Sequence, residues 1–211
     1  IHTKSNETLL KEIPSIPFHD LSIVFYLFLD KDEHGQMTVL IRNDHLPIWN
    51  TDTSELYKLA IDNTPRLYPP CIRSMASLIN DMLFVNGTLI QPSFAAASPN
   101  ALDLTDSPIP LSILTNTSGI FGASAMLYPG VLKEFSKKIG HDLIILPSSV
   151  HEVLLLPYDS TYSFQEMADM VKDVNEKCVP VEEQLSNQVY YYSSAQDSIF
   201  LGGDPASRIL S

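Results

Sequence analysis

Several features that mark particular classes of protein are scarce in this sequence. Only two cysteines, Cys71 and Cys178, occur in 211 residues, so neither a disulfide-rich scaffold nor a cysteine zinc site is expected. The longest apolar run, residues 21–29, is about half the length that a membrane-spanning helix requires. Basic residues are few, 13 against 25 acidic ones, and the net charge of −12 would repel a polyanion. The composition therefore argues against nucleic acid and anionic membrane surfaces as partners.

The two cysteines also bear on the cellular compartment. In a chain long enough to bury its own core, two isolated cysteines are expected to remain free thiols, as in a reducing cytoplasm, and a single disulfide is the alternative. No signal peptide opens the sequence, which starts at Ile1 rather than at a methionine. We therefore expect a cytoplasmic protein, and we expect this chain to be a fragment that lacks an N-terminal portion.

What the sequence does contain is an alternation of extended and helical patterns. Residues 20–30 are rich in β-branched and aromatic side chains, which predicts a buried strand. A polar turn and a second strand over 36–43 complete an antiparallel hairpin. Apolar residues at helical spacing predict helices over 51–63 and 71–84. The single tryptophan, Trp49, is expected to anchor the core.

The second half of the chain gives clearer signals. Ser163 and Glu166 form a capping box at the start of an amphipathic helix, and a Pro-Gly pair at 129–130 interrupts another helical segment. The tyrosine run 190–192 predicts one buried and one solvated face, as on an edge strand. The predicted elements are strands over 111–116, 142–148 and 151–157, helices over 123–140 and 163–179, and a closing hairpin over 188–194 and 197–203.

These elements predict an α+β fold with a mixed, largely antiparallel sheet covered by helices, because some strands adjoin in sequence and others are separated by helices. The length suits a single domain over residues 1–211. The alternative is two lobes, 1–84 and 111–201, joined by the proline-rich loop 85–110.

One stretch, LPSSVHEVLLLP at residues 146–157, places polar residues between apolar runs. Ser149 and His151 would share one face of an extended strand, so a hydroxyl nucleophile could meet an imidazole base, with Glu152 as the third candidate catalytic residue. Alternation, however, directs Glu152 to the opposite face, and the G-x-S-x-G nucleophile motif is missing. The other interpretation is structural: Pro147 and the serines turn the chain, and a second strand begins at His151.

A second candidate lies in TNTSGIFGASA at residues 115–125, where a strand leads through two glycines into a helix. Backbone N–H groups at such a helix start can hold a phosphate or carboxylate group. Asn116, Ser118, Gly119 and Gly122 are therefore candidate ligand-binding residues. Neither the P-loop nor the dinucleotide-binding glycine motif is present, so a capped turn that needs glycine for its backbone conformation is the alternative.

Arg66 and Arg73 flank a proline-rich turn and extend this candidate site, because a guanidinium group binds carboxylate or phosphate through two hydrogen bonds. In so acidic a chain, the alternative is that both arginines pair with the protein's own carboxylates. The His151-Glu152 pair lacks the second histidine of the H-E-x-x-H zinc motif. We accordingly expect no bound metal and no cofactor.

Four stretches carry a resemblance to a known family. They are NTPRLYPPCIRSM, ILTNTSGIFGASAMLYPGVLKEFSKKIG, LPSSVHEVLLLP and MVKDVNEKCVPVEEQLSNQVYYY, in that order. Together they resemble the bacterial family of unknown function 5688, from about Glu7 to Tyr192. The resemblance implies a bacterial, cytoplasmic protein. Because members carry a further N-terminal segment, it also implies that this chain is the C-terminal portion of the family. It implies no activity and no catalytic residue.

Two functions of different classes follow from these residues. The first is a non-catalytic binding or interaction module, with an unknown protein or a small anionic ligand at a cleft between the 116–123 loop and the 147–151 turn. On this hypothesis, Gly122→Val weakens binding without unfolding the domain. The alternative is a serine-dependent hydrolase with Ser149 as nucleophile and His151 as base. A structural role inside a larger assembly is a third possibility.

Overall fold

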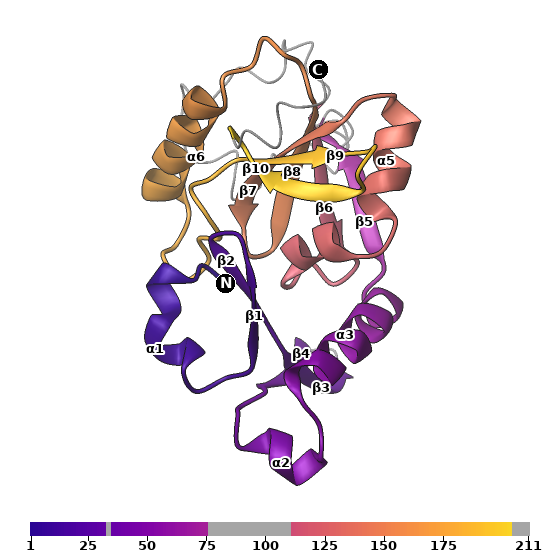
Figure 1. The fold of residues 1–211 in the computed structure, drawn as a ribbon, viewed down its shortest axis with the longest axis vertical. Helices are drawn as coiled ribbons and strands as arrows, with labels where there is room; N and C mark the ends of the chain where they lie inside the picture. Colours follow the sequence, from indigo (N-terminus) through magenta and orange to yellow (C-terminus); the bar gives the residue numbers. More distant parts are fainter. Residues whose placement is uncertain (33–34, 76–110, 204–211) are drawn as a thin grey trace, which may run out of the picture. The chain divides into compact units, whose positions relative to one another are not determined.

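A computed structural model describes residues 1–32, 35–75 and 111–203 of the chain (Figure 1). The chain divides into two compact units, Ile1–Leu67 and Tyr68–Ser211. Each unit has its own strands and its own apolar core, so each is described by itself.

The first unit consists of short elements around a small core. In chain order they are the 3-10 helix η1 (Lys4–Asn6), α1 (Glu7–Leu10), β1 (Ser15–Phe18), β2 (Leu21–Val24), β3 (Tyr26–Asp32), β4 (Gly35–Leu40), α2 (His45–Trp49) and α3 (Thr53–Leu67). β1 pairs with β2, and β3 with β4, each as a two-stranded antiparallel sheet. Phe25, Ile41 and Leu56 are buried together and form the centre of the core.

Two expectations for this unit are wrong. The single buried strand expected over 20–30 is divided at Phe25, because that side chain enters the core and its carbonyl accepts a hydrogen bond from the Ile41 N–H at 2.9 Å. The part that follows, β3, carries several exposed apolar side chains instead of buried ones. Trp49 is 44% exposed and lies against the His45 ring, so it does not anchor the core. The helix expected over 51–63 is confirmed as α3.

The second unit contains a six-stranded sheet with helices. Its elements are β5 (Pro70–Ser74), β6 (Ser112–Asn116), the 3-10 helix η2 (Gly122–Leu127), α5 (Val131–Ile139), β7 (Leu143–Ser149), β8 (Glu152–Pro157), α6 (Phe164–Cys178), β9 (Tyr190–Ser193) and β10 (Ser198–Leu201). The strand order is β10-β9-β7-β8-β6-β5. Every strand pair among the described residues of both units is antiparallel, which confirms the α+β class and the largely antiparallel sheet.

The central strands of this sheet are covered on both faces. Ile144 and Leu154 pack with Val171 of α6 in one buried cluster. On the other side, η2 contacts β6 and β8, and α5 follows η2 (Figure 1). Coverage on both faces explains why β7 and β8 are continuous apolar runs rather than alternating ones. It also leaves polar residues only at the strand ends, where the candidate site lies.

Two expectations for the second unit also fail. Residues 71–74, expected to begin a helix, instead form β5, because they pair with β6 along its whole length; the rest of that predicted helix, 76–84, lies outside the described residues. Tyr190, Tyr191 and Tyr192 are all buried, because β9 lies between β7 and β10 rather than at an edge. The linker 85–110 of the two-lobe alternative also lies outside the described residues, so the choice between one domain and those two lobes stays a prediction.

Candidate functional site

The candidate site lies at the tip of the β7–β8 hairpin, where Val150 and His151 connect the two strands. Two other segments hold this tip. The Ala123 N–H donates to the Val150 carbonyl at 3.3 Å, and the Val150 N–H donates to the Glu183 carbonyl at 2.8 Å. The loop after β6, the hairpin tip and the turn after α6 therefore meet at one place, so the two stretches selected from the sequence are brought together.

Ser149 and His151 are neighbours, but they do not form a nucleophile–base pair. The Ser149 hydroxyl oxygen accepts a hydrogen bond from the backbone N–H of His151 at 3.1 Å. The His151 ring is engaged elsewhere: Nδ1 accepts from the Phe121 N–H at 3.3 Å, and Nε2 lies 3.9 Å from Glu183 Oε1. An accepting Nδ1 places the proton on Nε2, which faces the Glu183 carboxylate. The imidazole therefore links the loop, the tip and the turn.

Glu152, the third candidate catalytic residue, follows the tip at the start of β8. Burial raises the pKa of its carboxyl group above the ordinary value, while the electrostatic interaction with His151 and a hydrogen bond from Ser148 act in the opposite direction. Its partner on β7 is Ser149, across a register irregularity after Pro147. The carboxylate near the histidine Nε2 is that of Glu183, which sequence reasoning did not select.

The loop after β6, which contains Gly119 and Gly122, is held closed by hydrogen bonds to the side chain of Asn116. Asn116 Oδ1 accepts hydrogen bonds from the N–H groups of Ser118 and Gly119 at 3.0 and 2.9 Å, and from the Ser118 hydroxyl at 2.9 Å. Asn116 Nδ2 donates to the Ile120 carbonyl at 3.0 Å. The amides that an anion would need are thus already bound, and the following η2 is a single short 3-10 helix. The turn interpretation of this loop accounts for these contacts.

Gly122 is required by close packing. A Cβ at this position would lie 2.1 Å from Thr115 Oγ1, 2.3 Å from the His151 carbonyl oxygen and 2.9 Å from the Asn116 nitrogen. Thr115 Oγ1 itself donates to the His151 carbonyl at 2.8 Å, so neither oxygen can move without breaking that bond. The expectation that Gly122→Val leaves the fold intact is therefore wrong, because two backbone segments would have to separate.

Phe121 is the residue that sequence reasoning missed most clearly. Its backbone is left-handed, with φ at 51°, although it carries a large side chain, and that side chain is 39% exposed. The Phe121 ring stacks on the His151 ring, with 6.1 Å between centroids and 14° between planes. Ile120 is also exposed, and the turn after α6 presents Val181, which is 80% exposed. We call Ile120, Phe121, His151, Val181 and Glu183 the tip surface.

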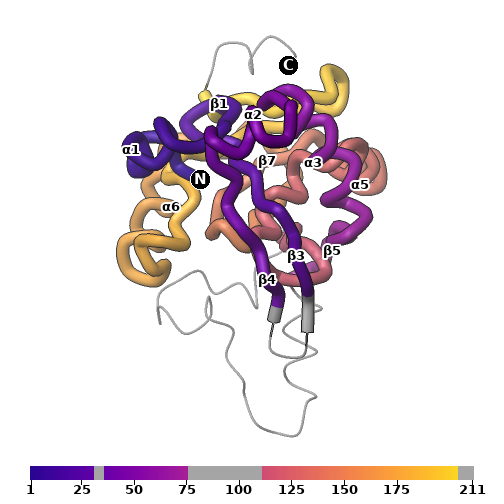
Figure 2. Tube along the Cα trace, turned by 90° about the horizontal axis from the view of Figure 1, so that it is seen from below, coloured from indigo at the N-terminus to yellow at the C-terminus, as the bar shows by residue number. Residues whose placement is uncertain are grey.

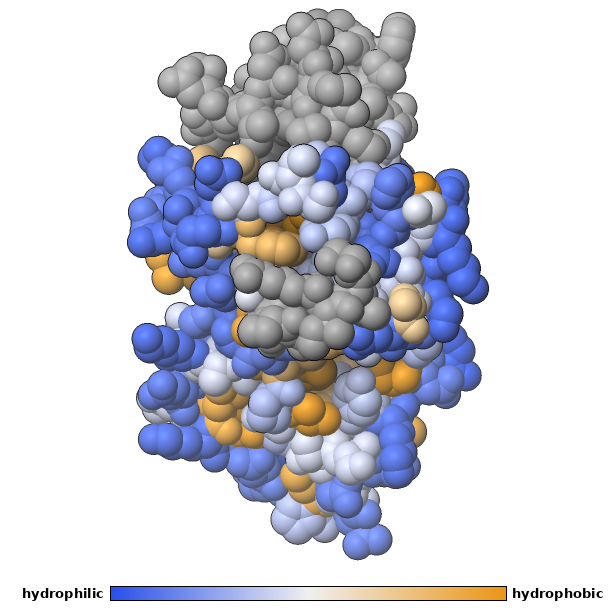
Figure 3. Space-filling view, turned by 45° about the horizontal axis from the view of Figure 1, so that its top comes forward, coloured by the Kyte–Doolittle hydropathy of each residue, from blue (hydrophilic) through white to orange (hydrophobic). Residues whose placement is uncertain are grey.

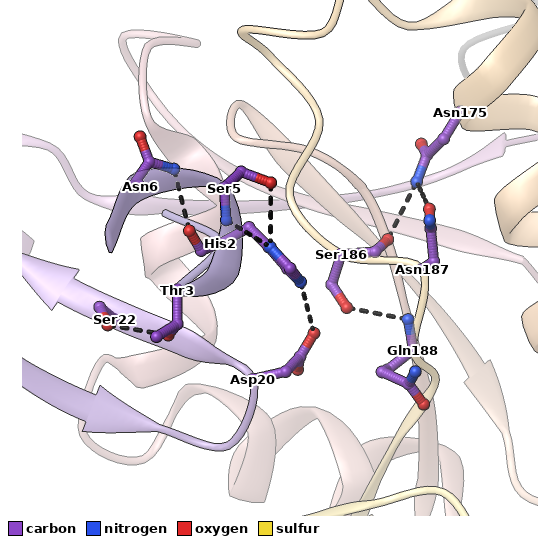
Figure 4. Close-up of polar contacts among 10 residues, drawn as sticks. All are labelled: His2, Thr3, Ser5, Asn6, Asp20, Ser22, Asn175, Ser186, Asn187 and Gln188. Atoms are coloured by element: carbon purple, nitrogen blue, oxygen red, sulfur yellow. Dashed lines mark hydrogen bonds and ion pairs between the residues drawn. The ribbon is translucent and has the colours of Figure 1, made fainter. Parts of the chain in front are cut away.

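The segment after α6, which carries Val181 and Glu183, is fixed to that helix by side-chain hydrogen bonds. Asn175, almost fully buried on α6, donates to the Ser186 carbonyl at 2.9 Å and to Asn187 Oδ1 at 2.7 Å (Figure 4). Gln184 Nε2 donates to the carbonyl groups of Asn175 and Val179. A buried amide with both hydrogens bonded is a strong positional restraint, so the tip surface stands on a rigid support.

The two candidate arginines lie in different parts of the fold. Arg66 lies in the last turn of α3 in the first unit and bonds to Asp62 and Asn63 of the same helix, as the self-pairing alternative predicts. Arg73 lies on β5 in the second unit, opposite Ile113. The two residues thus belong to different units.

A second serine–histidine contact occurs at the start of the first unit (Figure 4). His2 Nδ1 lies 3.2 Å from Ser5 Oγ, and His2 Nε2 lies 3.4 Å from Asp20 Oδ2. The backbone N–H of Ser5 also points at Nδ1, at 3.4 Å. The imidazole therefore acts as a cap for the first helical turn, and the Asn6 side chain reinforces it by donating to the His2 carbonyl.

Two other kinds of functional feature are absent from the described part of the chain. No group of three His, Cys, Asp or Glu residues there has an arrangement suited to a metal ion. None of the helices there has the length and apolar character needed to cross a membrane.

Fold and site together define a two-unit α+β protein with a six-stranded antiparallel sheet and a braced hairpin tip. The chain belongs to the family of unknown function DUF5688, whose profile matches residues 1–194. The resemblance seen in the sequence is thereby confirmed over slightly wider limits, and the narrower expectation of a C-terminal portion is slightly off. No curated protein and no solved structure matches the chain.

Proposed function

We propose that this protein is a non-catalytic binding module of the bacterial cytoplasm and that it binds a protein partner through the tip surface. One observation carries the proposal: the polar groups of the loop and the tip bond to one another, whereas Ile120 and Phe121 expose apolar side chains beside them. Exposed aromatic residues on a rigid support are typical of protein interfaces.

A protein partner fits these contacts better than a small anion. The side-chain oxygen of Asn116 already occupies the loop amides that would bind a phosphate or carboxylate. Glu183 adds a carboxylate to the same surface, and the chain as a whole carries a net charge of −12. Both features disfavour an anionic ligand, and they disfavour nucleic acid and anionic membranes for the same reason.

The hydrolase alternative receives less support from the site. A nucleophilic serine must donate its proton to the base, but the His151 ring nitrogens are engaged elsewhere: Nδ1 accepts from the Phe121 N–H and Nε2 faces Glu183. Activation of Ser149 would therefore require the histidine to leave both of its contacts. The cytoplasmic part of the proposal is supported by the low cysteine content of the chain, two residues in 211.

Site-specific photo-crosslinking tests the proposal. A benzoylphenylalanine residue replaces Ile120 in the full-length chain, expressed in bacterial cells, and a matched variant carries it at the exposed Gln165 of α6. Irradiation is expected to give a discrete protein adduct from position 120 and none from position 165. Adding Phe121→Ser should remove the adduct, while adding Val39→Thr in the first unit should leave it.

Three outcomes would overturn the proposal. The first is no adduct from position 120, and the second is the same adduct from both positions. The third is labelling of the wild-type protein by a serine-directed fluorophosphonate, lost in Ser149→Ala and kept in Ser5→Ala, which would favour hydrolysis. A screen of phosphates, nucleotides and carboxylates by thermal unfolding should be flat, since a ligand at 100 times its Kd adds about 2.7 kcal/mol.

A further inference from the structure

A separate apolar surface occurs in the first unit, on the β3–β4 hairpin. Much of the visible molecular surface is hydrophilic, as the charge of the chain leads one to expect, but apolar areas interrupt it (Figure 3). On this hairpin, Leu27 is 42% exposed, Leu29 49%, Met37 61% and Val39 40%. Single exposed apolar residues are normal, whereas four on one short hairpin form a patch.

The pairing of the two strands places these four side chains on one face. Leu27 is directly opposite Val39, and Met37 is two residues from Val39, hence on the same side of β4. A β-bulge between Phe28 and Asp30 inserts Leu29, so that Leu29 and Asp30 both lie opposite Met37. Because of the bulge, Leu29 and Asp30 lie next to each other at the end of the apolar face, instead of pointing to opposite sides of the hairpin.

The hairpin is anchored at its base and not along this face. Phe25 immediately before β3 and Ile41 immediately after β4 are both buried in the core of the unit, and the Ile41 N–H bonds to the Phe25 carbonyl. From there the two strands run side by side away from α2 (Figure 2). The anchored base fixes the orientation of the hairpin, so its apolar face is held ready for a contact rather than collapsing on the core.

The size of the face indicates what can cover it. A large aromatic side chain that becomes fully buried removes about 150–250 Å² of surface from solvent. Four half-exposed aliphatic side chains are smaller, so together they can contribute less than about 500 Å² to an interface. A stable interface between two folded proteins buries about 800 Å² on each side. The face is therefore too small to hold two copies of this chain together, and it suits a short segment of another protein.

The charge around the face indicates the composition of that segment. Asp30 follows Leu29 and lies opposite Met37, so a carboxylate borders the apolar face. The chain carries 25 acidic and 13 basic residues, so a second copy would also be repelled. Lysine or arginine next to the apolar residues of a partner would instead complement this end of the hairpin.

From these observations we infer that the apolar face of β3–β4, formed by Leu27, Leu29, Met37 and Val39, binds an extended protein segment in which aliphatic residues adjoin lysine or arginine. This interaction is independent of the tip surface, since it uses residues of the other unit. It gives the protein a second binding surface and the capacity to connect two partners.

A peptide selection tests this inference with the intact chain. Random 12-residue peptides are displayed and selected on immobilised wild-type protein, and enriched peptides are then measured by fluorescence anisotropy. The hairpin variant is Leu27→Thr with Val39→Thr, since threonine keeps the strand propensity. The matched control is Met170→Thr, which removes an exposed apolar side chain of α6 that belongs to neither surface. Met37→Thr serves as a milder hairpin variant should the double exchange lower the melting temperature.

The expected result is enrichment of peptides with aliphatic and basic residues. Their affinity should fall at least tenfold in the hairpin variant, stay within twofold in Met170→Thr, and weaken in 0.5 M salt. Three results would overturn the inference: no enriched peptide that distinguishes wild type from the hairpin variants, enrichment of acidic peptides, or a wild-type dimer in sedimentation that Met37→Thr converts to monomer. None of these depends on the crosslink at position 120, so the two proposals can fail separately.

Discussion

The two ends of strand β7 carry carboxylates whose titration the fold shifts in opposite directions. Before the strand begins, Asp142 accepts hydrogen bonds from the Ser194 N–H at 2.9 Å, from the Ser194 hydroxyl at 2.6 Å and from the Tyr191 hydroxyl. Burial acts to raise the pKa of Asp142, but these hydrogen bonds together bring it below its ordinary value. Beyond the other end, burial raises the pKa of Glu152 above its ordinary value.

The difference separates an end of β7 that contributes to stability from an end that contains energetically unfavourable features. At the Asp142 end, every contact of the carboxylate favours its charged form. At the tip, a glutamate is partly desolvated, Phe121 adopts a left-handed backbone conformation, and its ring remains exposed. Unfavourable features of this kind persist where function requires them. The comparison therefore supports a binding role for the tip rather than for the opposite end.

The largest effect is expected from Gly122→Ala, which would break the tip itself. The added methyl group would collide with Thr115 and with the His151 backbone, so we expect a loss of about 3 kcal/mol or more in the free energy of unfolding. Urea denaturation measures it. Gly119→Ala is the control: no atom lies within 4 Å, and only its positive φ is strained, at about 1 kcal/mol. Equal losses in the two variants would show that the tip is not closely packed.

At the opposite end, Asp142→Asn should destabilise the protein by about 1 kcal/mol at pH 7, a value reduced for the partial exposure of the group. The lowered pKa means that ionised Asp142 stabilises the fold above its unfolded pKa of about 3.9, and that this contribution is lost as the pH falls through the folded value. Urea denaturation at pH 7, 5 and 3 should show the difference between wild type and variant shrinking only at the lowest pH. A difference that is constant with pH would exclude a role for the charge.

Phe121→Gly should separate stability from binding at the tip. Glycine relieves the left-handed strain of about 1–2 kcal/mol, while the stacking on His151 is lost. We expect a free energy of unfolding within about 1 kcal/mol of wild type, together with loss of the crosslinked adduct from position 120. If the variant is much less stable than wild type, the phenylalanine is a packing residue, and the comparison between the two ends loses its main support.

The smallest effect is expected from Glu152→Gln, and its sign is opposite to that of Asp142→Asn. Because the pKa of Glu152 is raised in the fold, the ionised form is disfavoured there, so replacing it stabilises the protein at pH 7. The gain should disappear below the unfolded pKa of about 4.3. In a chain of this size, about 1 kcal/mol of stability corresponds to about 2–4 °C in the melting temperature. Thermal unfolding at pH 7 should therefore show a melting temperature that is higher than that of wild type by no more than this amount. Glu182→Gln, at an exposed position of the neighbouring turn, should leave the melting temperature unchanged at both pH values.

Much of the fold could be predicted because its signals are local. The helix α6 begins after Ser163, whose hydroxyl accepts from the Glu166 N–H as the capping box predicts. The Pro-Gly pair at 129–130 separates η2 from α5, and the apolar runs of β7 and β8 are buried strands. In each case, neighbouring residues decide the outcome, so the pattern along the chain is sufficient.

The failures have the opposite origin. Residues 71–74 have apolar residues at helical spacing, yet strand pairing with β6, some 40 residues later in the chain, overrides that pattern. The burial of all three tyrosines depends on the neighbours that β9 acquires in the sheet. The tip surface combines Phe121, His151 and Glu183 from three segments, and no spacing in the sequence announces their contact. His151 itself was found, but as a base for Ser149.

The strand order of the sheet has a consequence for synthesis on the ribosome. β6 pairs with β5 on one side and with β8 on the other, and its residue Leu114 meets Val153 only after about 40 further residues have been added. At a translation rate of about 5–20 residues per second, this takes roughly 2–8 s. During that interval, β6 is an apolar strand with one edge open to other chains. The nascent protein is thus most prone to aggregate while β7 and β8 are being made. Once β8 pairs with β6, that edge can no longer pair with another chain.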